Sequence, residues 1–359
     1  MKKEGNKNSV IELIRFFAIS VIVFFHIEIY YFNKPLHFNY GYIFVEFFFI
    51  ISGFFAMMNI SKKDNFSGFE IVKMLWHKFK SIYPKYLAAF ALSFIIIVIY
   101  IQKTNISEIF QKLINYKWEI FGLHFSGFIQ GENWEKVLNI PAWYISSLII
   151  SFAVFVILAT KFKKAFIYLI APISILLTYS TFINQFGTLD LNIQLTNIFG
   201  FIINTGNMRA FAGMSLGAIC YYIYLKIRED ENNKKTKVIF TFVEVFLYCS
   251  ILYLLKFNEL LNNEDMVFYI FIFAVLVIIE FSKKGYIATF CSRVFNKIPI
   301  YLGDLSLYMF LFQYPVILLY KEDFSDIGYF KGMLIIYISI FVISVLIKSV
   351  FEIVKRIKK

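Results

Sequence analysis

The stretch IELIRFFAISVIVFFHIEIYYF, residues 11–32, decides the fold class, because it is long and apolar enough to cross a membrane as one helix. It carries Arg15 and His26, eleven positions apart. At about 100° per residue, this spacing returns His26 to within about 20° of the Arg15 face, about 16 Å further along the axis. One helix face therefore presents a cation near one membrane surface and an imidazole well across the bilayer. Ionisable groups inside a membrane span are costly and indicate a functional site by default.

The rest of the chain repeats this apolar pattern. Its 359 residues are 59% hydrophobic, and the mean hydropathy of +0.68 is far above that of a soluble domain. We predict an all-α integral membrane protein that forms a single polytopic domain over residues 1–359. A membrane β-barrel would instead show alternating segments of about ten residues. The ten predicted spans are roughly 10–32, 40–60, 83–101, 140–160, 164–182, 208–226, 237–256, 266–281, 298–320 and 331–352.

The net charge of +12 would suit a nucleic-acid partner, but the placement of the charges argues against one. Most of the 36 Lys and Arg residues lie at the N-terminus, in the even-numbered loops and at the C-terminus. This asymmetry follows the positive-inside rule and places both termini in the cytoplasm. The three cysteines form no motif, so we expect neither a disulfide scaffold nor a metal site.

Depth along the predicted helices groups the polar side chains. His26, Glu46 and Gln313 fall at a similar level in the outer half of the membrane, whereas Ser306 lies nearer to Arg15 in the inner half. A carboxylate bonded to one ring nitrogen of His26 would fix its tautomer and raise the basicity of the other nitrogen. Such an imidazole can take a proton from a hydroxyl or carry an acyl group. The alternative is that Glu46 and His26 only satisfy each other and help two helices associate.

Four stretches taken together resemble the membrane-bound acyltransferase-3 family. They are the Arg–His pair of the first span, GYIFVEFFFIISGF at 41–54, MRAFAGMSLGA at 208–218 and YLGDLSLYMFLFQYPV at 301–316. Members of this family move acyl groups, usually acetyl, from coenzyme A onto extracytoplasmic polysaccharides and related acceptors. The resemblance extends over almost the whole chain. It implies a multi-pass protein of the bacterial cytoplasmic membrane, with acetyl-CoA as donor, a cell-envelope polysaccharide as acceptor and membrane lipid around it.

Position by position, the resemblance implies roles for individual residues. It implies a catalytic group of His26, Glu46 and Arg15, and acceptor-binding roles for Trp143, Arg209, Ser306 and Gln313. The sequence departs from the family pattern at three places. Lys78 and Ser81 replace an Arg-x-x-Arg pair, Leu148 stands where many members have Glu, and Gln313 stands where His is common.

The coenzyme A phosphates need cations at a cytoplasmic helix entry. Lys78, Lys80 and Lys85 offer point charges there, with Arg15 deeper in the slot. The alternative is that these lysines only obey the positive-inside rule. We also expect a break in the second span at Ser52–Gly53, whose freed backbone amides would polarise the thioester carbonyl. Close helix packing by small residues is the alternative there.

Two functions from different classes remain open. The first is an O-acyltransferase that acts on a cell-envelope glycan. The second is a transporter, for instance a flippase for a polysaccharide or a lipid-linked sugar, because ten spans with an internal polar track also suit a carrier. No inverted repeat is visible in the sequence, which favours the enzyme.

Overall fold

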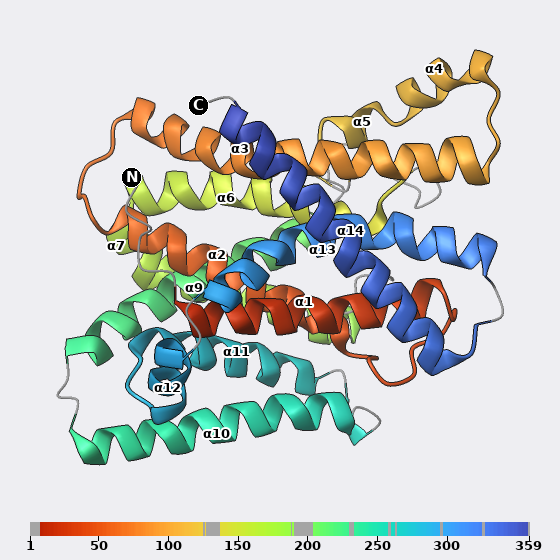
Figure 1. Cartoon of the computed structure of the whole chain (residues 1–359). Coiled ribbons are helices and arrows are strands. Elements are labelled where there is room, and N and C mark those ends of the chain that lie inside the picture. The colour runs from red at the N-terminus through yellow and green to blue at the C-terminus, as the bar shows by residue number, and fades with distance from the viewer. Residues whose placement is uncertain are drawn as a thin grey trace.

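The computed structural model describes residues 8–124, 126, 137–187, 189, 204–229, 233–257, 260–262, 264–294, 297–324 and 327–357. In this part of the chain, ten helices are long and apolar enough to cross a membrane, and no strand is present. The predicted fold class and number of spans are therefore confirmed. Most of the spanning helices run roughly parallel, and α14 crosses the view obliquely; α1 begins and α14 ends at the same end of the bundle (Figure 1). We call this the terminal end and the opposite one the far end.

The helices follow one another along the chain, most of them through short connections. The main ones are α1 (Ser9–Tyr30), α2 (Phe44–Ile60), α3 (Gly68–Ser93, continued by a π-helical turn Phe94–Ile101), α4 (Ile106–Asn115), α5 (Lys117–Ile120), α6 (Trp143–Lys161), α7 (Lys163–Ala165), α8 (Ala171–Thr181, between π-helical segments Phe166–Ile170 and Phe182–Phe186), α9 (Thr205–Glu229), α10 (Lys234–Lys256), α11 (Asp265–Ser282), α12 (Tyr286–Val294), α13 (Lys297–Asp323) and α14 (Tyr329–Ile357).

The third span is longer than predicted. Its helix covers Gly68–Ile101, 34 residues, whereas the sequence indicates only 83–101. Ser67 caps the helix start, and Glu70 completes a capping box, so the amphipathic segment before Pro84 is helical as well. At about 51 Å this helix exceeds a hydrocarbon core of about 30 Å. Its first turns therefore lie beyond the apolar layer, at the terminal end.

Burial separates inner from outer helices. The apolar windows of α2 and α13 are each 72% buried, whereas those of α10 and α14 are 22% buried. Glycines bring α2 against α9: a Cβ at Gly53 would lie 2.0 Å from the Met214 carbonyl oxygen, and one at Gly217 would lie 2.0 Å from that of Ile50. Small residues at such a contact let two membrane helices approach closely. The α2–α9 pair is thus part of the core of the bundle.

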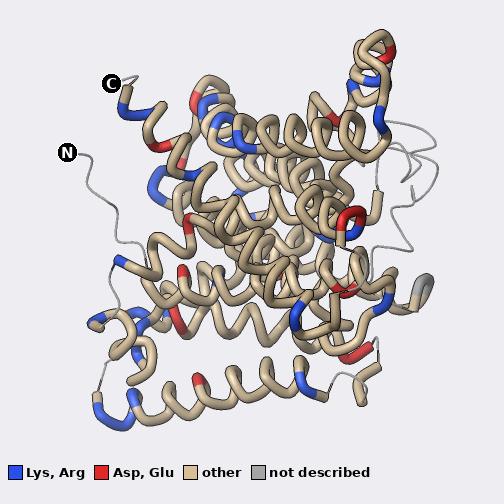
Figure 2. Tube along the Cα trace, turned by 45° about the vertical axis from the view of Figure 1, so that its right-hand side comes forward, with Lys and Arg blue, Asp and Glu red and all other residues tan. Residues whose placement is uncertain are grey.

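Charged residues are unevenly placed. In Figure 2 the Lys and Arg positions gather mainly at helix ends, including the terminal end, and the middles of the helices are nearly free of them. The charged side chains that do lie inside the bundle are therefore the ones that need an explanation.

Candidate functional site

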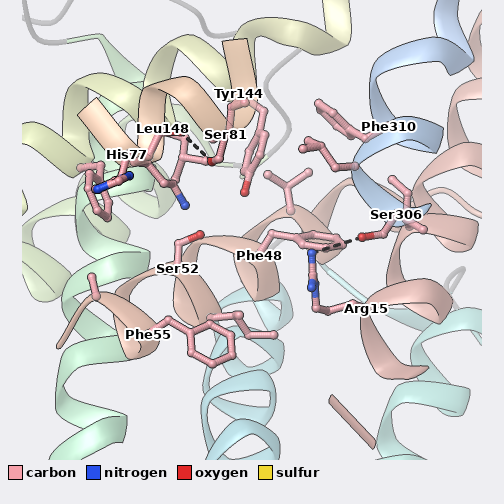
Figure 3. A pocket seen from close by; sticks show the side chains of 18 of the residues that line it. Arg15, Phe48, Ser52, Phe55, His77, Ser81, Tyr144, Leu148, Ser306 and Phe310 are labelled. Atoms are coloured by element: carbon pink, nitrogen blue, oxygen red, sulfur yellow. Dashed lines mark hydrogen bonds between the residues drawn. The ribbon is translucent and has the colours of Figure 1, made fainter. Parts of the chain in front are cut away.

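A cavity of about 700 Å³ enters the bundle between α1, α2, α3, α6 and α13. On α2 its lining runs from Asn59, next to the terminal end, to Val45, about 21 Å along the helix axis. Most of the wall is aliphatic or aromatic, and its polar lining consists of Arg15, Ser52, Asn59, His77, Lys78, Ser81, Tyr144 and Ser306 (Figure 3). Among the described residues, no Asp or Glu lines this cavity. The charged side chains of the lining are therefore cationic, and most of the remaining wall is apolar.

Arg15 is fixed at the wall of the cavity by residues from two helices. Its Nη1 donates to Glu12 Oε2 at 2.7 Å, and its Nη2 lies 3.4 Å from Ser306 Oγ on α13. Gly303 makes room for this carboxylate, because a Cβ there would lie 2.0 Å from Glu12 Oε2. Gly303 and Ser306 of the 301–316 stretch thus both help to position Arg15. The predicted proximity of Ser306 to Arg15 is confirmed.

The three lysines of α3 have different surroundings. Lys78 lines the cavity, with Nζ 5.2 Å from the centre of the Phe152 ring. Lys80 is exposed, and Lys85 donates to the Ser81 carbonyl at 2.9 Å and lies over the Tyr308 ring. Neither Lys80 nor Lys85 is among the residues that line the cavity. Lys80, two positions from Lys78, faces another way, and Lys85 lies about two turns further along the helix. That these lysines hold the coenzyme A phosphates stays a prediction.

Ser52 lines the cavity, but the helix break predicted there is absent. α2 runs as an unbroken α-helix from Phe44 to Ile60. Gly53 instead packs against the α9 backbone at Met214, which is the alternative reading of this pair. No backbone amide is freed for the thioester. The cavity offers a side-chain donor instead: in Figure 3 the Tyr144 hydroxyl points into the cavity between Ser52 and Phe48.

His26 lies on α1 one turn beyond Ile22, which lines the cavity toward the far end. Its Nδ1 is 3.0 Å from Oε1 of Gln313 on α13, as their similar depth predicts. Its ring also packs near Tyr30, with ring centres 5.5 Å apart. Among the described residues, Nε2 of His26 has no hydrogen-bond partner.

Glu46 does not join His26, and the predicted carboxylate–imidazole pair is wrong. Glu46 Oε1 accepts from Arg209 Nε at 2.5 Å, and Glu46 Oε2 accepts from the Tyr179 hydroxyl at 3.1 Å. Both charged side chains are fully buried. Arg209 also donates to the Leu189 carbonyl at 2.9 Å and lies 5.6 Å from the centre of the Trp143 ring. These charges neutralise each other inside the protein. Acceptor contacts by Arg209 and Trp143 stay predictions.

Sequence reasoning missed four side chains of this region. Glu12 carries a readable signal, because it stands three positions before Arg15 and so lies on the same helix face. His77 adjoins Lys78, and Tyr144 adjoins Trp143, which the family resemblance includes. Adjacency in sequence does not show which way a side chain points. Tyr179, the second partner of Glu46, has no sequence signal, since its contact depends on how α8 packs.

The fold and the site define a multi-pass membrane protein with a cationic cavity that opens toward one end and a histidine beyond its inner limit. The family model described as acyltransferase domain matches residues 8–352, so the chain belongs to the acyltransferase-3 family. The protein is an acyltransferase, and this finding favours the enzyme over the transporter. Searches of curated proteins and of solved structures found no match.

Proposed function

We propose that this protein transfers an acetyl group from acetyl-CoA to a hydroxyl of an extracytoplasmic polysaccharide or glycoconjugate of a bacterial cell envelope. The terminal end faces the cytoplasm in this proposal, as the positive-inside rule predicts. The single observation that carries it is the cationic cavity, which enters from the terminal end and stops one helical turn before His26. A donor that enters from the cytoplasm would thus present its reactive end to a residue near the other side.

The cavity suits coenzyme A in charge and in polarity. The phosphates of coenzyme A would meet Lys78 and His77, with Lys80 at the exposed surface of the same helix. Arg15 lies deeper and brings a forked donor group. The slender arm of the donor would run between apolar walls toward Tyr144 and Ser52. Because no carboxylate in the described part of the chain lines the cavity, the charged groups that the phosphates would meet on its wall are cations.

His26 is the proposed reacting side chain, and two routes fit it. As a general base, it takes the proton of the acceptor hydroxyl while that oxygen attacks the thioester carbonyl carbon; the C–S bond breaks and the thiolate leaves. As a nucleophile, it attacks the carbonyl itself, holds the acetyl group, and gives it up to the hydroxyl in a second step. In both routes the hydroxyl proton ends on the thiol of free coenzyme A, and one ester replaces one thioester.

The test is turnover of radiolabelled acetyl-CoA by the purified protein in lipid nanodiscs, with and without cell-envelope glycan. We expect slow hydrolysis alone and faster label transfer with the acceptor, and both should vanish in His26→Ala. His37→Ala is the matched control, since His37 is an exposed histidine of the next loop. The proposal fails if the wild type neither binds nor turns over acetyl-CoA, or if His26→Ala keeps wild-type turnover.

A further inference from the structure

The environment of Gln313 determines which nitrogen of His26 is available for reaction. Gln313 is fully buried on α13. Its Nε2 donates to the Phe310 carbonyl oxygen at 3.0 Å, and its Oε1 lies 3.0 Å from His26 Nδ1. These two contacts use opposite ends of one amide. The orientation of the amide therefore decides which atom faces the imidazole.

The Phe310 carbonyl fixes that orientation. A carbonyl oxygen can only accept hydrogen bonds, so the NH₂ end of Gln313 must face it. Turning the amide over would set two acceptors against each other at Phe310. The oxygen of Gln313 therefore faces His26, and since it too can only accept, the hydrogen lies on His26 Nδ1. In the neutral imidazole the lone pair is then on Nε2.

The backbone around Gln313 is held in place at the same level. Pro315 has no N–H, so the Leu311 carbonyl lacks its helical donor. Asn139 replaces it, with Nδ2 donating to that carbonyl at 2.9 Å. On the other side, the Phe310 ring lines the cavity and packs edge-on against Tyr144 at 5.2 Å. A continuous set of contacts thus connects the cavity wall to the His26 ring.

We propose that Gln313 is a positioning residue that holds His26 as its Nδ1–H tautomer, so that Nε2 is the atom that takes the hydroxyl proton or the acetyl group. The inference rests on the proposed function, in which His26 is the reacting residue. It assigns to a neutral amide the task that a carboxylate has in many histidine sites. Glu46 is not available for this task, because Arg209 and Tyr179 occupy both of its oxygens.

The tautomer can be measured directly on the wild type, without any assay of activity. The chain has only four histidines, so solid-state ¹⁵N spectra of histidine-labelled protein in lipid are simple, and His26→Ala assigns the signal. Protonated and bare ring nitrogens differ widely in ¹⁵N shift. We expect His26 with a proton on Nδ1 and a bare Nε2 at neutral pH. A proton on Nε2 instead overturns the proposal, whatever the protein does with acetyl-CoA.

Kinetics of variants give a second test. Gln313→Met keeps the volume and loses the acceptor, so kcat should fall on the order of 100-fold or more. The KM for acetyl-CoA should not change, because only the histidine is disturbed. Gln313→Glu keeps an acceptor toward His26 but sets a second carboxyl oxygen against the Phe310 carbonyl, so its kcat should fall, but by less than that of Gln313→Met.

Asn139→Leu is the matched control for a merely structural effect. It removes a side-chain bond to the same helix, two positions from Gln313, without touching His26. It should lower the thermal midpoint but reduce kcat far less than Gln313→Met. If the wild type is active, two results would contradict this inference alone. One is a Gln313→Met variant with full kcat, and the other is a Gln313→Glu variant as inactive as Gln313→Met. An inactive wild type would contradict the proposed function instead.

Discussion

Two groups of charged residues lie inside this bundle, and they differ in what surrounds them. Arg15 and Lys78 face a cavity of about 700 Å³, whereas Arg209 and Glu46 are fully buried against each other. Both arginines lie in stretches on which the family resemblance rests. A charged side chain within a span therefore indicates function only where it lines a cavity. A closed pair instead holds helices together.

The largest expected effect is on the closed pair. Arg209→Met leaves the Glu46 carboxylate buried without its cation, so the free energy of unfolding should fall by about 3–5 kcal/mol. Glu46→Leu together with Arg209→Met should recover most of this loss, because two charges are no longer desolvated. Unfolding in mixed detergent micelles measures both. If the double variant is as unstable as Arg209→Met, mutual neutralisation of the two charges does not account for the contribution of this pair to stability.

The open group should show the opposite behaviour, with a change in binding and little change in stability. Arg15→Met should weaken acetyl-CoA binding by about 10- to 100-fold, the effect of one charge-assisted contact. The acetyl-CoA affinity of Arg15→Lys should lie between those of the wild type and of Arg15→Met, because lysine keeps the charge and loses the forked geometry. Isothermal titration in nanodiscs measures the affinity. Lys34→Met, which removes an exposed charge, is the control, and an unchanged affinity in Arg15→Met would exclude this residue from donor binding.

The contact between α2 and α9, the two helices that carry the closed pair, can also be perturbed without changing any charge. Gly53→Ala places a methyl group 2.0 Å from the Met214 carbonyl oxygen and should cost about 1–3 kcal/mol of stability by forcing α2 from α9. Gly328→Ala is the control, since a Cβ there meets nothing within 4 Å. Thermal unfolding of the two variants decides the matter: equal midpoints would mean that α2 and α9 are not held by this contact.

A pH-dependent effect is expected outside the spans, at Glu119. Burial raises the pKa of this carboxyl from 4.5 to about 7, although the Leu138 and Asn139 backbone amides donate to it. The folded state therefore keeps the proton to higher pH than the unfolded state. Its contribution to stability is full below about pH 4.5 and is lost as the pH rises through about 7.

Glu119→Gln should remove this part of the pH dependence. The thermal midpoint of the wild type should fall between pH 5 and pH 7 relative to that of the variant. Glu108→Gln, on the exposed surface of α4, should keep the wild-type slope. Parallel curves for the wild type and Glu119→Gln would show that Glu119 titrates as an ordinary carboxyl.

Apolar runs sufficed to predict the ten spans. Depth along them correctly predicted that Ser306 lies at a level near Arg15 and that His26 and Gln313 meet. Depth gives only one coordinate, however. The rotation of each helix depends on packing. The glycine contacts with α9 turn Glu46 toward Arg209, and this is why its pairing with His26 was wrong.

The third span shows a second limit of the sequence. Its first turns are amphipathic, so an apolar window begins too late, although the capping pattern at Ser67 and Glu70 is readable. Lys78 and Lys80 lie before the predicted start of this span, so the predicted spans do not place them on one helix with Lys85.

The most direct test of the account is the sidedness of the reaction. Proteoliposomes of known orientation would receive labelled acetyl-CoA on one face only, with a soluble glycan on the other. We expect turnover when acetyl-CoA meets the terminal end, and label on the glycan across the membrane. Turnover that requires acetyl-CoA at the far end would contradict it.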